Sequence, residues 1–168
     1  RAAGFAFDRT RFRGTYMRGV GEVEATLYPG DSASYEFQVD YALRAGEGEL
    51  RIRDLVLQME SANWRASYPA TVSWQGPHLR VDSLELRDST HGGRIFVRGD
   101  VPDTGAIALD VALEGVRIAP WIAITQGDLD ADGVVRGRLA LSGTRASPRL
   151  EGTTAVTAAR YDGAPFPD

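Results

Sequence analysis

The chain has 168 residues, no cysteine and a formal net charge of −4. All 19 of its basic residues are arginine, and only two histidines are present. The absence of cysteine excludes disulfides and thiol chemistry. The absence of lysine excludes a Walker A phosphate loop and Schiff-base catalysis. The acidic balance argues against nucleic-acid binding. These exclusions favour a non-catalytic protein that takes no cofactor.

Positive charge and aromatic residues gather at the N-terminal end. Residues 1–20 carry a net charge of +4, so the other 148 carry −8. We interpret 1–34 as a basic, aromatic edge segment and 35–168 as one curved β-sheet module, part of a longer protein. The basic end could contact anionic lipid or an acidic partner, or it could be an edge strand whose arginine stems cover apolar surface. The predicted contact residues are Arg9, Arg11, Phe12 and Arg13.

Alternation of apolar and polar residues dominates the chain and is typical of strands with one buried and one solvated face. In residues 35–44 the apolar positions are odd and the polar positions even. The pattern slips by one residue after Asp54 and again at Asp82-Ser83, and each slip predicts a β-bulge. Further strands are predicted over 49–59, 71–74, 79–86, 94–98, 107–114 and 134–141.

Helix signals are confined to residues 118–124, where Pro120 suits a first helical turn. We expect one or two turns that plug an end or corner of the sheet. The predicted fold is therefore all-β: a curved, elongated antiparallel sheet, of β-taco or open-sandwich type, with about ten strands and one short helix. No apolar run approaches the roughly 18 residues of a transmembrane helix.

Short glycine-bracketed segments recur along the chain. Residues 93–99 match residues 137–143, and 48–54 is a looser third copy. Such repeats indicate either a sheet that grows along one axis or chance matches in a glycine-rich meander.

The block Gly-Thr-x-x-x-Pro-x-Leu-x-Gly at residues 143–152 resembles a recurring segment of TamB proteins (translocation and assembly module B) and their AsmA-like relatives. The strand pattern over residues 35–162 is similar to that family as well. This resemblance implies a long curled sheet with an apolar inner groove in the bacterial periplasm or cell envelope, peripheral to the membrane. It also implies the handling of phospholipid or the assembly of outer-membrane proteins, and it brings no catalytic residues.

An aliphatic trough is the predicted site. Strands with one apolar face that curl without closing leave space for lipid acyl chains, which need no base, metal or nucleophile. The predicted lipid-binding residues are Val81, Leu86, Ile95, Val97, Leu109, Val111, Leu139 and Leu141. The alternative is an accessory structural subunit that docks onto a membrane-protein complex. A third, weaker hypothesis is a carbohydrate-binding β-sandwich.

No metal site is predicted. Asp128, Asp130 and Asp132 match the first half of an EF-hand loop, but Leu139 stands where the bidentate glutamate belongs, so a solvated turn is favoured. His78 and His91 lie beside turn residues and lack the three or four converging ligands that zinc requires. We expect both to be exposed loop histidines.

Overall fold

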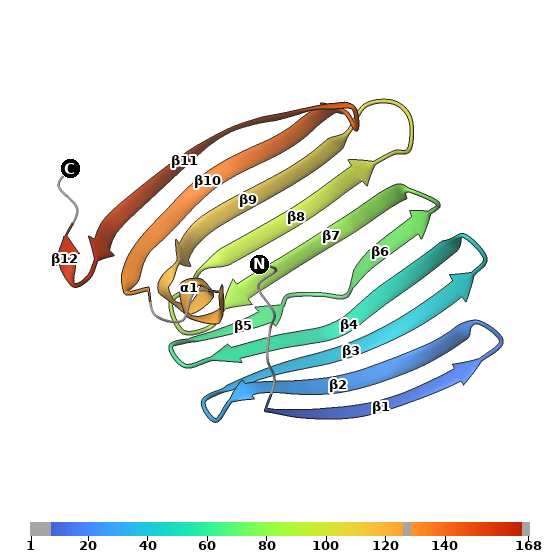
Figure 1. Cartoon of the computed structure of the whole chain (residues 1–168), viewed down its shortest axis with the longest axis horizontal. Helices are drawn as coiled ribbons and strands as arrows, with labels where there is room; N and C mark the ends of the chain where they lie inside the picture. The colour runs from blue at the N-terminus through green and yellow to red at the C-terminus, as the bar shows by residue number, and fades with distance from the viewer. Residues whose placement is uncertain (1–7, 126–128, 166–168) are drawn as a thin grey trace.

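The computed structural model describes residues 8–125 and 129–165 of the chain. Within these residues the protein is one antiparallel sheet of twelve strands with one short helix (Figure 1). The elements are β1 (Arg9–Met17), β2 (Val20–Gly30), β3 (Ala33–Arg44), β4 (Glu47–Met59), β5 (Ala62–Ala66), β6 (Ala70–Gln75), β7 (His78–Asp88), β8 (Arg94–Val101), β9 (Ala108–Arg117), α1 (Ala119–Thr125), β10 (Ala131–Thr144), β11 (Ser147–Tyr161) and β12 (Ala164–Pro165).

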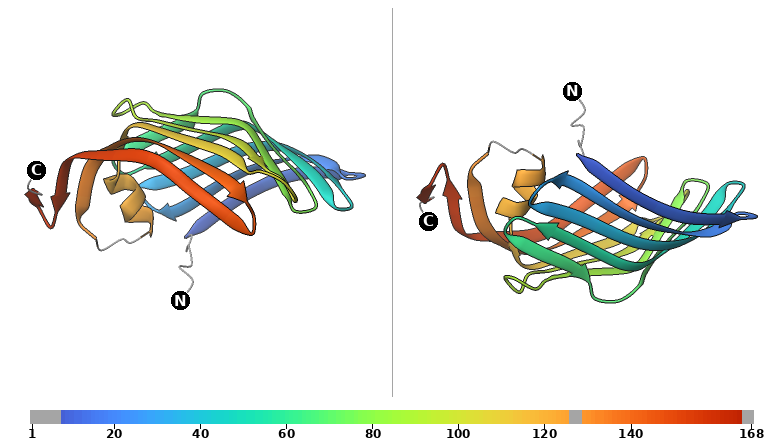
Figure 2. Two further views of the ribbon diagram at one scale, coloured as in Figure 1. Left: turned by 90° about the horizontal axis from the view of Figure 1, so that it is seen from above. Right: turned by 90° about the horizontal axis from the view of Figure 1, so that it is seen from below.

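The sheet is a meander in which strands adjacent in sequence are adjacent in space. The exception lies between β4 and β7, where two short strands, β5 and β6, share one place in the sheet. β5 pairs with residues 56–59 of β4, and β6 pairs with residues 47–52 of β4. Figure 2 shows that the sheet is strongly curved and that α1 lies against one end of it. The expected curved all-β fold with one short helix is confirmed.

The N-terminal segment belongs to this sheet. β1 forms one edge, and β2 pairs with β1 on one side and with β3 on the other, with a register shift between Leu27 and Gly30 in the β2–β3 pair. The expected division between residues 34 and 35 falls inside β3, so no structural boundary separates the basic segment from the rest. The helix is seven residues long and, among the described residues, nothing helical could cross a bilayer.

Both predicted bulges are present. Gln38 faces Asp54 while Val39 faces Ile52, so β4 holds one extra residue there. In β7 the register shifts between Val81 and Leu84. Because each bulge restores the phase of the alternation, the apolar residues before and after it project from the same side of the sheet. We call this side the apolar face and the other side the polar face.

The core lies at the α1 end of the apolar face. Trp64 is 1% exposed, and the Trp121 side chain of α1 packs edge-on against it with ring centroids 5.5 Å apart. Around this pair the buried cluster includes Tyr35, Leu55 and Leu86. The helix therefore covers one end of the apolar face, as the sequence predicts.

Hydrogen bonds from one arginine join the strand connections at the opposite end. Arg145 lies in the turn between β10 and β11, and its guanidinium donates to the carbonyl oxygens of Pro102 (2.9 Å), Val101 (3.2 Å) and Pro77. These carbonyls belong to the β8–β9 and β6–β7 connections. Arg145 thus links turns that are several strands apart and helps to set the curvature there.

Replacing the buried tryptophan tests the position of the core. Trp64→Ala should lower the free energy of unfolding by about 3–5 kcal/mol, because it removes a fully buried ring and leaves a cavity. Trp74→Ala is the matched control: Trp74 is only half-buried on the same face, so its loss should be clearly smaller. Urea unfolding followed by circular dichroism measures both, and equal losses would contradict this placement of the core.

Replacing Arg145 tests its hydrogen bonds to the neighbouring strand connections. Arg145→Ala should cost about 1 kcal/mol, since its hydrogen bonds are exposed to water. It should also speed amide hydrogen exchange in residues 101–107. Arg149→Ala removes a neighbouring arginine whose contact is a loose 3.9 Å ion pair with Glu151, so exchange in residues 101–107 should stay unchanged.

Candidate functional site

The predicted lipid-binding residues share one surface. Val97 faces Val111, and Val111 in turn faces Leu139, so three neighbouring strands place an aliphatic side chain in one row. Directly opposed residues of an antiparallel sheet project to the same side. All eight predicted residues lie on the apolar face by this criterion: Val81, Leu86, Ile95, Val97, Leu109, Val111, Leu139 and Leu141.

This row has no second layer over it within the described part of the chain. Every described element other than α1 is a strand of the same sheet, and α1 lies at one end (Figure 2). Leu86 belongs to the buried core cluster, whereas the other seven side chains remain half-buried. The single curved layer therefore leaves an aliphatic surface open next to the end of the apolar face that α1 covers.

The apolar face continues to both edges of the sheet, where it carries exposed side chains among the described residues. On β1, Phe12 and Tyr16 are each 71% exposed, and Tyr16 stacks on Tyr41 with centroids 6.5 Å apart. On β11, Leu150 is 67% exposed and Val156 is 52% exposed. Contiguous exposed apolar surface marks interaction sites in soluble proteins.

The predicted contact residues of β1 are divided between the two faces. Phe12 faces Ala25 on the apolar face, whereas Arg9, Arg11 and Arg13 alternate with it and belong to the polar face. Strand alternation separates neighbouring residues in this way. The Arg9 guanidinium lies 4.2 Å from the centroid of the Tyr28 ring, which fits an edge strand whose arginine stems cover apolar surface.

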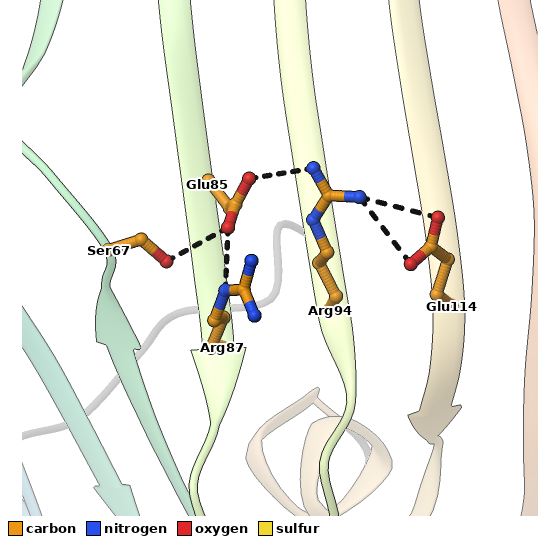
Figure 3. Close-up of polar contacts among 5 residues, drawn as sticks. All are labelled: Ser67, Glu85, Arg87, Arg94 and Glu114. Carbon is orange, nitrogen blue, oxygen red and sulfur yellow. Dashed lines mark hydrogen bonds and ion pairs between the residues drawn. The ribbon is translucent and has the colours of Figure 1, made fainter.

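Buried charges stabilise the polar face beside the interruption between β5 and β6. The Glu85 carboxylate is 2.7 Å from both the Arg94 and the Arg87 guanidinium, and it accepts a hydrogen bond of 3.1 Å from the Ser67 hydroxyl (Figure 3). Arg94 also reaches Glu114 at 3.4 Å. The bond from Arg94 contributes most to lowering the pKa of Glu85 to about 2. At neutral pH Glu85 is thus a fixed charge that ties Ser67, in the strand interruption, to β7 and β8.

A second buried carboxylate orders the turn between β7 and β8. Asp88 is 3% exposed and accepts hydrogen bonds from the backbone N–H groups of Thr90 (2.9 Å) and Asn63 (3.2 Å). Its other oxygen is 2.9 Å from Nδ1 of His91. Burial opposes ionisation of Asp88, but the hydrogen bonds from Thr90, His91 and Asn63 outweigh it and lower the pKa.

The histidines and aspartates singled out in the sequence have separate partners. His78 opens β7 and lies 2.6 Å from Asp100, whereas His91 contacts Asp88. Both are partly exposed and lie at turns or strand ends. Asp132 pairs with Arg117, and Asp128 lies outside the described residues. The described residues contain no group of three or more side chains that could hold a metal ion.

The polar face also holds a hollow, which the sequence analysis did not predict. It has a volume of about 580 Å³ and lies across β8 to β11. Ala112 and Ala140 leave room in it between the longer side chains of Arg98, Arg138 and Glu151. In the sequence, this hollow is indicated only by the two alanines, which occupy polar-face positions on strands that otherwise place charged residues there.

Comparison with known proteins adds nothing to this geometry: no family model, curated protein or solved structure matches the chain.

Acid titration tests the role of Glu85. Its pKa lies below the ordinary value of 4.5, so its contribution to stability is present above about pH 4.5 and is lost as the pH falls toward about 2. Glu85→Gln should reduce stability at neutral pH and flatten the loss of stability between about pH 4.5 and pH 2. Unfolding midpoints in urea measure this. Glu114→Gln, at the exposed end of the same network, is the control and should leave the acid loss nearly intact.

Proposed function

We propose that this chain is a non-catalytic β-module of the bacterial cell envelope, peripheral to the membrane, that binds or conducts lipid acyl chains or supports outer-membrane assembly. The observation that carries the proposal is the row of aliphatic side chains on β7 to β10, which are half-buried and which no second layer covers among the described residues. Such a surface binds methylene chains by burial alone and requires no reactive group.

The energetics favour an acyl chain over a small polar ligand. Each methylene removed from water contributes about 0.8 kcal/mol, so ten methylenes give roughly 8 kcal/mol before the entropy of binding is subtracted. The Trp121–Trp64 contact covers the α1 end of the apolar face. An acyl chain would therefore reach the aliphatic row from the opposite end or across a sheet edge.

The envelope location rests on the resemblance of residues 143–152 to TamB and AsmA-like proteins. In this chain the block forms the β10–β11 hairpin. Gly143 adopts a φ of 81°, a conformation that a side chain disfavours. The backbone N–H of Ser147 donates to the Thr144 hydroxyl at 3.2 Å. The conformation of Gly143 and the Ser147–Thr144 hydrogen bond thus show how this block forms the hairpin between β10 and β11.

One observation supports a second candidate, an accessory structural subunit that docks onto a membrane-protein complex. All nine residues of β1 are exposed, and this strand presents arginines on one side and Phe12 and Tyr16 on the other. Exposed arginines on one side and exposed aromatic rings on the other suit side-chain contact with an acidic protein partner or an anionic surface.

Paired substitutions on the two faces test lipid binding. Val111→Glu combined with Leu139→Glu puts charges into the aliphatic row and should weaken binding of a fluorescent acyl-chain phospholipid at least about tenfold. Ala112→Glu combined with Ala140→Glu changes the adjacent residues, which project from the polar face, and should leave binding intact. Equal effects of the two pairs, or no binding by the unaltered chain, would refute acyl-chain binding.

Co-purification separates the two candidates. Native mass spectrometry of the chain from its source should show stoichiometric phospholipid if the apolar face binds acyl chains. A stoichiometric protein partner without lipid would favour the docking subunit.

A further inference from the structure

The two long edges of the sheet differ in how they are protected. Unpaired edge strands invite pairing with another chain, and charged side chains on the edge are one defence. β1 has this defence in Arg9, Arg11 and Arg13, which would face one another in an antiparallel β1–β1 pair. β11 has such residues only in its first part, 147–151, and in Arg160: its residues 152–159 contain neither a charge nor a proline.

β11 is open along most of its length. Fourteen of its fifteen residues are exposed. Within the described part of the chain, its outer edge is covered only at Arg160 and Tyr161, by the two-residue strand β12. Ala158 adopts a φ of 51° and interrupts the regular register with β10. The segment that is both regular and free is therefore 147–157.

Within this segment the exposed apolar side chains have a symmetric arrangement. Leu150 faces Leu141 and Val156 faces Val135, so both project from the apolar face. Each lies three residues from Thr153. An antiparallel pair of β11 strands related by a two-fold axis at Thr153 therefore brings Leu150 of each copy opposite Val156 of the other.

We propose that a second copy of this chain pairs with β11 in this register, as a two-fold symmetric dimer. Thr153 then faces Thr153, and Gly152 faces Thr154. At the ends, Arg149 faces Thr157 and Glu151 faces Ala155, so no like charges oppose each other. Such a dimer is isologous and closes after two copies.

Two other positions of the two-fold axis are less favourable than Thr153. A two-fold axis at Leu150 would leave Val156 uncovered and bring Pro148, which has no N–H, into the paired segment. An axis at Val156 would run into the irregularity at Ala158 and into β12. The axis at Thr153 places the two apolar side chains opposite each other and keeps the paired residues 149–157 within the free segment.

The pairing goes beyond the proposed function and does not depend on it. It would join the apolar faces of two copies into one sheet surface across the β11 edge. Self-association without lipid tests the dimer alone, so failure of lipid binding and failure of dimerisation are distinguishable.

Cysteine cross-linking tests the register directly, because the chain has no cysteine of its own. Directly opposed residues of antiparallel strands have Cα atoms about 4.5–5.5 Å apart, which suits a disulfide. Thr153→Cys should give at least about tenfold more covalent dimer under mild oxidation than Thr10→Cys, a threonine on the exposed β1 edge. The double variant Leu150→Cys with Val156→Cys should also cross-link, and each single variant should not.

Sedimentation of the 168-residue chain tests the dimer without cross-links. Leu150→Lys or Val156→Lys places a charge at two symmetric points and should raise the dimer dissociation constant at least about tenfold. Leu43→Lys alters a residue of the apolar face that is 42% exposed and distant from β11, so it should leave dimerisation unchanged. Circular dichroism confirms that each variant folds.

Three outcomes would overturn the proposal: a chain that stays monomeric at the highest concentration at which it remains dispersed, cross-linking of Thr10→Cys equal to that of Thr153→Cys, or a ladder of higher oligomers. A ladder would indicate head-to-tail pairing of β1 with β11, which does not close.

Discussion

The two-residue period of the side chains is the constraint on which the rest of the structure depends. Most of the large aliphatic residues lie on one face because the bulges in β4 and β7 absorb the one-residue slips in the sequence. Without the bulge near Asp54, one half of β4 would turn its apolar residues to the polar side. The continuous apolar face, the core and the candidate site all follow from this coherence.

A single curved layer has a physical consequence for stability. Only the α1 end gains a dense core, where Trp121 covers Trp64, and the remaining apolar face is half-buried by neighbouring side chains alone. Ion pairs from Arg94 to Glu85 and Glu114 cross between strands on the polar face and add to the hydrogen bonds that hold the strands together. Because the protein has a single layer, an aliphatic surface and two long edges stay open among the described residues. The proposed lipid binding uses the surface, and the proposed self-association uses one edge.

Alternation predicted more than the bare fold class. It grouped eight residues from four strands on one face, located two bulges and confined the helix to residues 118–124. It was less informative for β11, where threonine, alanine and glycine replace the large aliphatic residues that make alternation visible. The grouping of Phe12 with the neighbouring arginines came from composition instead, and adjacent strand residues necessarily project to opposite sides.

By itself, the sequence determined what depends on local periodicity: strands, their sidedness, the bulges, the short helix and the scarcity of reactive side chains. Only the tertiary structure decided which distant residues meet. The Arg145 guanidinium bonds to the carbonyl of Pro77, sixty-eight residues away, and Glu85 draws on Ser67, Arg87 and Arg94 from three segments. The curvature of the sheet sets these contacts, and that curvature arises from the summed twist of all its strands rather than from the pattern of any one.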